Sequence, residues 1–106
     1  MEILEKLTAT FGVSGRESEI NQVITDLVKD HVDRVMTDGI DNVIAVKNGY
    51  GKDKKKIMVS AHKDEIGFMV MYIDSDGYIY LRPVGGIPVS VSIGNRIIFR
   101  NGTVGV

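Results

Sequence analysis

The sequence contains no cysteine, which excludes a disulfide framework and a thiolate zinc site and agrees with a reducing compartment. No apolar run approaches the roughly 20 residues that a membrane-spanning helix needs. There is also no excess of one charge, because 13 basic residues stand against 14 acidic ones, so we expect neither nucleic acid nor membrane as a partner. The N-terminus lacks the basic and apolar regions of a signal peptide, and we therefore expect a cytoplasmic protein.

The composition is that of a globular domain. With 106 residues, of which 43% are hydrophobic and 25% charged, the chain can form a core, although a small one. Helical spacing dominates its beginning, where apolar residues at positions 3, 4, 7 and 11 predict a short helix. Ser14 and Glu17 form the Ser-x-x-Glu pattern of a capping box. An amphipathic helix follows from Ile20 and is expected to end near Asp30.

Beyond this helix, short runs of β-branched and aromatic residues predict strands and no further helix. The expected strands are residues 32–37, 42–46, 57–61, 68–73, 78–81, 96–100 and 103–106. Asp38-Gly39 and Asn101-Gly102 are typical hairpin turns, whereas residues 89–93 are ambiguous. Because antiparallel neighbours need only tight connections, the first strands are expected to form a meander.

The stretch from Ile57 to Val70 carries the candidate chemistry. Its apolar start, residues 57–59, predicts a buried strand that leads directly to His62, Asp64 and Glu65. A buried carboxylate without a partner costs several kcal/mol, so partners or a metal ion are expected there. In an extended chain His62 and Asp64 point to the same side, about 6.6 Å apart at roughly 3.3 Å per residue. This arrangement suits an imidazole ligand beside a carboxylate that orients it or contacts a second ion.

A structural interpretation of the same residues stays open. His62 can be a satisfied histidine at a strand end, with Asp64 and Glu65 as solvated or capping residues. Lys63 should face away from the other two by alternation, but its cation would oppose metal binding if it turned inward. The other histidine, His31, is interpreted as a surface residue near a helix C-terminus, where a cation is mildly favoured.

Several segments resemble one family of enzymes. Residues 60–70, Ser-Ala-His-Lys-Asp-Glu-Ile-Gly-Phe-Met-Val, are similar to the Ala-His-x-Asp-Glu-Ile-Gly-Phe-Met-Val segment of the M42 metalloaminopeptidases. Residues 12–17 resemble the family's Gly-x-Ser-Gly-x-Glu turn, and residues 41–45 resemble its Asp-x-x-Gly-Asn-x-Ile segment. Residues 84–86 and 93–97 are similar to the block that follows. Matches in the right order are far more specific than any one of them.

The resemblance implies a fold of the α/β class, α+β within this stretch. Residues 1–70 would begin a metallopeptidase α/β sandwich, and residues 71–106 would begin an inserted small β-barrel domain that serves in oligomer assembly. It further implies a metal-dependent aminopeptidase with two divalent ions, zinc or cobalt, that cleaves N-terminal residues from peptides and forms a homo-oligomer at full length. The predicted final strand, residues 103–106, is apolar and open, whereas complete domains usually cover such a strand. We therefore expect an N-terminal fragment of a longer protein or a truncated gene product.

For the site, the resemblance implies that His62 ligates one metal ion and that Asp64 is a catalytic carboxylate that orients the ligands. Glu65 would be structural, and the remaining ligands and the general base would lie beyond Val106. Because one imidazole cannot build a zinc site, we expect this chain alone to be inactive and to bind metal weakly or not at all.

Two alternatives remain. The chain could be a non-catalytic, β-rich interaction module whose His62 segment is only a polar strand end. It could also be a glycoside hydrolase, because some relatives carry endoglucanase labels. The second alternative ranks low, since such enzymes need two carboxyls about 5 to 9.5 Å apart across the sugar. Asp64 and Glu65 are adjacent and should face opposite ways.

Overall fold

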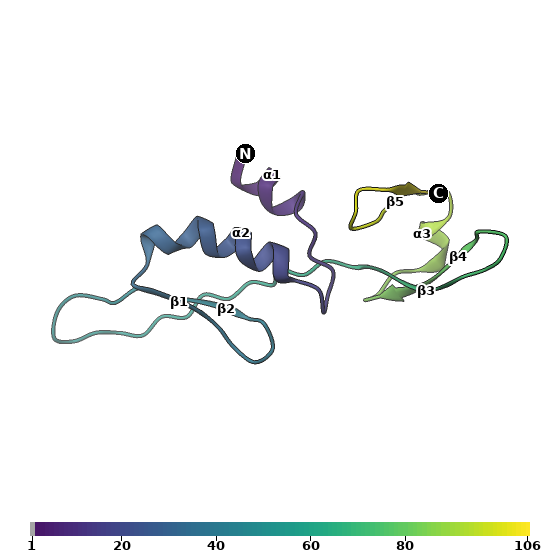
Figure 1. Ribbon diagram of the computed structural model, residues 1–106. Helices are drawn as coiled ribbons and strands as arrows, with labels where there is room; N and C mark the ends of the chain where they lie inside the picture. Colours follow the sequence, from purple (N-terminus) through teal and green to yellow (C-terminus); the bar gives the residue numbers. More distant parts are fainter. Residues whose placement is uncertain (1) are drawn as a thin grey trace. The chain divides into compact units, whose positions relative to one another are not determined.

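The computed structural model describes residues 2–106, with residue 89 by its backbone alone, and the chain divides into two compact units (Figure 1). The first unit is Met1–Gly12 with Arg16–Lys63, and the second is Val13–Gly15 with Asp64–Val106. Among the described residues, none of the helices has both the length and the apolar character needed to cross a membrane. The mixed helix and strand content confirms the predicted fold class.

The first unit joins two helices to a hairpin. The helix α1 (Glu2–Thr8) contacts α2 (Ser18–Val28), which continues into the 3₁₀ helix η1 (Lys29–His31). Both predicted helices are therefore confirmed. The strands β1 (Arg34–Thr37) and β2 (Val43–Val46) pair antiparallel, as predicted, and α2 contacts β2. The apolar face of α2 forms the small core, because Ile20 is only 3% exposed.

The predicted capping box is wrong. The helix α2 begins at Ser18, its N-cap is Glu17, and no side chain caps it by a hydrogen bond. Ser14 lies instead in a turn with Gly15, whose φ of 82° is a left-handed conformation that glycine adopts without strain. The Ser14 amide donates to the Glu65 carbonyl oxygen at 3.2 Å, so the backbone at Ser14 is engaged in a bridge and the helix starts later.

The second unit contains two hairpins and one short helix. The strands β3 (Gly67–Ile73) and β4 (Ile79–Val84) pair antiparallel, and β5 (Ile97–Ile98) pairs with β6 (Val104–Gly105). Both hairpins confirm the predicted pairs of strands, although β5 and β6 are shorter than expected. The ambiguous residues after Pro88 form the helix α3 (Val89–Ser92), so the expectation of no further helix is wrong.

The predicted buried strand at residues 57–61 is also wrong. Within the described chain these residues belong to no strand, and Figure 1 draws them as a plain trace. The side chains of Ile57, Met58 and Val59 are 86%, 89% and 91% exposed. The described strands form three separate two-stranded sheets instead of a meander. Periodicity identified a segment suited to a sheet, but a buried strand also needs neighbours to pair with and a face to cover it.

Candidate functional site

His62 and Asp64 lie in different units. His62 is an exposed residue of the first unit and comes near the end of residues 54–64, which contain no helix or turn. Asp64 is half-buried and belongs to the second unit. The metal site that the sequence predicts between them therefore stays a prediction. His31, the other histidine, is exposed at the end of η1, as expected of a surface residue.

Lys63 ties this segment to the first unit. Its Nζ donates to the carbonyl oxygen of Asp41, 22 residues earlier, at 2.9 Å, and its side chain is half-buried. Its own carbonyl oxygen lies close to Gly12, where an added Cβ would come within 3.5 Å of it. The same added Cβ would lie 3.1 Å from Cγ2 of Ile20, the buried residue of α2. Lys63 is thus attached to the unit through both its side chain and its backbone.

The acceptor of Lys63 sits in a turn that is stabilised by a carboxylate. Asp38 Oδ1 accepts from the backbone amides of Ile40 at 3.0 Å and Asn42 at 2.9 Å, and its Oδ2 accepts from Asn42 Nδ2 at 2.8 Å. These bonds, led by the one from the Asn42 side chain, lower the pKa of the Asp38 carboxyl, and the nearby Lys63 ammonium adds to the effect. Asp41 has a φ of 63°, a left-handed conformation that aspartate tolerates better than most residues.

A second donor reaches the same carbonyl from α2. Asn21 Nδ2 donates to the Asp41 oxygen at 3.2 Å, while Asn21 Oδ1 is buried without a hydrogen-bond partner. The Asp41 carbonyl therefore joins the helix, the turn and the segment that carries His62. Sequence reasoning missed this cluster, because its members are 20 and 22 residues apart and no local spacing relates them.

On the other side of Asp64, the backbone of Glu65 pairs with Val13 in a parallel bridge. Gly67 follows at the start of β3, and a Cβ added there would lie 2.5 Å from Val13 Cγ2, closer than any real contact. A glycine is therefore required for this approach. The exposed side chain of Glu65 is in keeping with the structural role expected for it, which stays a prediction.

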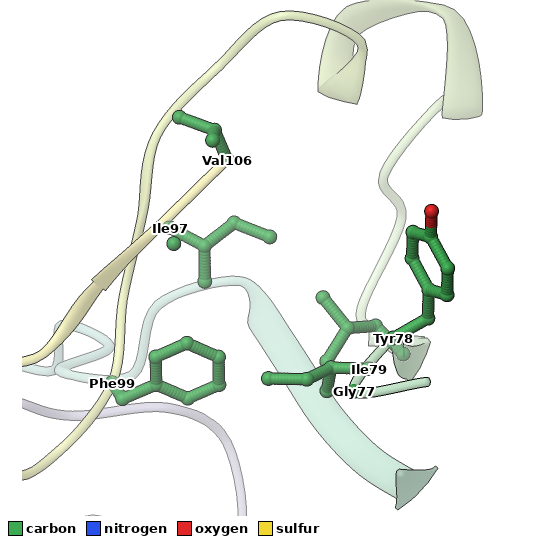
Figure 2. A pocket seen from close by; sticks show the side chains of 8 residues that line it. Gly77, Tyr78, Ile79, Ile97, Phe99 and Val106 are labelled. Atoms are coloured by element: carbon green, nitrogen blue, oxygen red, sulfur yellow. The ribbon is translucent and has the colours of Figure 1, made fainter. Parts of the chain in front are cut away.

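The second unit has a hollow of about 230 Å³ that contains none of the predicted site residues. In Figure 2, the side chains of Ile79, Ile97 and Phe99 face a common space, whereas the Tyr78 ring extends away from Phe99. Apart from the Tyr78 hydroxyl, the side chains that line the hollow are apolar, and the remaining lining residues are glycines. The hollow therefore adds nothing to the candidate chemistry.

The donor types at positions 62 and 64 fit a divalent ion in part. An imidazole and a carboxylate are both good ligands for zinc and related metals. A catalytic zinc site, however, uses three protein ligands, and within the described part of the chain no three His, Asp or Glu residues come together to hold an ion. These residues can supply a share of a metal site but not all of it.

Comparisons with known proteins point to one family. The family model described as M42 glutamyl aminopeptidase matches residues 41–106. A protein of Acetivibrio thermocellus, named only as a candidate aminopeptidase, is 48% identical over 104 residues and covers 98% of this chain. The lysyl aminopeptidase of Pyrococcus furiosus is 40% identical over 112 residues and covers 99% of it. The chain spans only 31% and 32% of these two relatives.

A solved structure is similar in fold. The aminopeptidase APDkam598 from the archaeon Desulfurococcus kamchatkensis superposes with a TM-score of 0.85 at 34% sequence identity. The match covers 97% of this chain and 29% of that protein. The arrangement of helices and hairpins described above is therefore one that occurs in a known aminopeptidase.

Proposed function

This chain belongs to the M42 glutamyl aminopeptidase family, and from that premise we propose that it forms part of a metal-dependent aminopeptidase. The substrate would be a peptide, from which the enzyme hydrolyses the N-terminal residue. The observation that carries the proposal is that the matched residues 41–106 include His62 and Asp64 in the family's Ala-His-x-Asp-Glu segment.

Within this proposal His62 holds one metal ion through an imidazole nitrogen. Asp64 is the catalytic carboxylate that orients the neighbouring ligands, and Glu65 keeps a structural role. Bound divalent ions, zinc or cobalt, would polarise the scissile carbonyl and lower the pKa of a water molecule. Because this chain supplies fewer than three grouped ligands, we propose that it is inactive alone and that further ligands come from elsewhere in a longer protein.

We also propose the division of labour that the family suggests. Residues 1–70 would belong to the catalytic domain, and residues 71–106 would open a small β-barrel domain used in assembly of a homo-oligomer. A cytoplasmic location is part of the same proposal. It is in keeping with the absence of cysteine from the sequence, since thiols stay reduced in that compartment and disulfides are rare there.

The decisive experiment compares the two histidines in a complete protein that contains this chain. We expect His62→Ala to lower the bound zinc or cobalt and to abolish hydrolysis of aminoacyl-anilides, because an imidazole ligand is lost. His31→Ala is the matched control, since this exposed histidine should leave both unchanged. Equal metal content in His62→Ala and the parent protein would contradict the proposal. Release of sugars from cellulose instead of amino acids would favour the glycosidase alternative.

A further inference from the structure

We propose that Lys63 is a positioning residue for His62. The ammonium group of Lys63, held on the carbonyl oxygen of Asp41, fixes the backbone from which His62 projects and so sets the direction of the imidazole. The inference rests on the proposed role of His62 as a metal ligand and adds a residue to it. Lys63 itself would touch neither metal nor substrate.

The acceptor is well suited to act as an anchor. Asp41 is held in its left-handed conformation within a turn that three hydrogen bonds to the Asp38 carboxylate stabilise. Asn21 Nδ2 fixes the same carbonyl oxygen from α2 at 3.2 Å. The oxygen that receives Lys63 Nζ at 2.9 Å is thus set in place by two other parts of the unit.

Lys63 attaches the segment that carries His62 to the Asp41 turn of the first unit. Residues 54–62 are all exposed and have no regular structure, whereas Lys63 is half-buried. The Lys63 carbonyl also lies against Gly12, so its backbone is confined where its side chain is bonded. Lys63 is therefore anchored through both its side chain and its backbone directly beside His62.

Adjacent side chains in an extended chain point to opposite sides. The exposure of His62 and the partial burial of Lys63, which is held toward Asp41, agree with side chains that point to opposite sides. A ligand that is already oriented loses less conformational freedom when it binds. Residues that orient metal ligands typically change metal affinity by about 10- to 100-fold when they are removed.

The same contact answers the electrostatic objection to a lysine beside a metal ligand. A free ammonium group next to His62 would repel a divalent cation. Bonded to the Asp41 carbonyl and close to the Asp38 carboxylate, whose pKa it helps to lower, the charge is directed away and partly balanced. Removing the charge alone should therefore strengthen cation binding, whereas removing the anchor should weaken it. Loss of the charge and loss of the anchoring bond therefore predict opposite changes in the cation affinity of a Lys63 variant.

The test uses Lys63→Met, which keeps an apolar stem of similar length but loses the donor, and Lys63→Arg, which keeps a donor. Lys56→Met is the matched control, because Lys56 is an exposed lysine of the same segment. Two properties are measured: the NMR order parameter of the His62 amide in this chain without metal, and, in a complete protein that contains this chain, the part of Co²⁺ binding that His62→Ala removes. Thermal unfolding shows that each variant is folded.

We expect an order parameter of about 0.85 at His62 in the parent chain and a fall toward about 0.6 in Lys63→Met. Co²⁺ affinity should fall at least roughly tenfold in Lys63→Met. Lys63→Arg should keep most of the His62 order parameter and of the Co²⁺ affinity, and Lys56→Met should change neither property. Asn21→Ala, which frees the same carbonyl without changing any charge, should move both properties in the same direction by less.

Three results would overturn the inference. These are a mobile His62 amide in the parent, an unchanged order parameter in Lys63→Met, and Co²⁺ affinity that stays equal or rises in that variant. Failure of the proposed function looks different, because His62→Ala would then bind Co²⁺ as well as the parent does, whatever residue stands at position 63.

Discussion

At the scale of single residues, Gly67 has the tightest surroundings of the described glycines. Its missing Cβ leaves room for Val13, and an added one would lie 2.5 Å from Cγ2 and 2.9 Å from Cγ1 of that side chain. We expect Gly67→Ala to lower the free energy of unfolding by about 1–3 kcal/mol, because β3 or the Val13 bridge must shift. Gly86→Ala is the control, since nothing lies within 4 Å of its added Cβ. Equal urea midpoints for the two variants would contradict this account.

Asp38 should make stability depend on pH. Hydrogen bonds from the Asn42 side chain and from the backbone amides of Asn42 and Ile40 lower the pKa of its carboxyl below the ordinary value of 3.8. The folded state therefore binds a proton less readily than the unfolded state. The stabilisation is complete above that ordinary value and is lost as the pH falls through the lower, folded-state pKa.

We therefore expect the free energy of unfolding to fall between about pH 6 and about pH 3, and Asp38→Asn to reduce this fall. Urea unfolding at the two pH values measures it. Asp53→Asn, in the exposed loop after β2, is the control and should keep the parent's pH dependence. A parent-like dependence in Asp38→Asn would show that other carboxyls are responsible.

At the scale of elements, α2 should be the main source of stability in the first unit. Its residue Ile20 is 3% exposed and packs where an added Cβ on Gly12 would meet it. We expect Ile20→Ala to cost about 2–5 kcal/mol and Ile20→Val about 0.5–1.5 kcal/mol. Ile3→Ala, at a position in α1 that is 61% exposed, should cost much less. Urea unfolding followed by circular dichroism gives all three values, and a similar cost for Ile20→Ala and Ile3→Ala would contradict the role of α2.

Local sequence signals predicted those elements whose contacts are local. The periodicity of α2 and the turns Asp38-Gly39 and Asn101-Gly102 act within a few positions, and the helix and both hairpins are present. The capping box failed because Ser14 is engaged by Glu65, which is 51 positions later in the numbering. The strand predicted at residues 57–61 is absent, because a local strand signal does not show whether a neighbouring strand is there to pair with it.

The candidate site was predictable only in its residue types. The pattern of His62 and Asp64 next to an apolar run is a local feature, and the family match covers it. The anchoring of Lys63 by Asp41 and Asn21 was not predictable, because hydrogen bonds over 20 or more positions depend on how α2 and the β1–β2 turn pack. A local sequence pattern therefore identifies candidate site residues, whereas the contacts that hold them depend on the tertiary structure.

At the scale of the whole molecule, both units expose large apolar side chains. Much of the exposed surface is apolar, and Ile57, Met58 and Val59 combine apolar side chains with a backbone that pairs with no strand of the described chain. Such a segment is a template for pairing with another chain.

We therefore expect concentration-dependent self-association of this chain, measured by sedimentation velocity at several protein concentrations. Val59→Lys should weaken the association roughly tenfold, because burial of one valine contributes about 1.5 kcal/mol and a charge at this position opposes pairing. Ile3→Lys, which adds the same charge at an exposed apolar position of α1, should weaken it much less. If both variants weaken association equally, net charge is the cause and the unpaired segment is not the contact. A parent chain that stays monomeric at high concentration would show that its exposed apolar surface does not drive association.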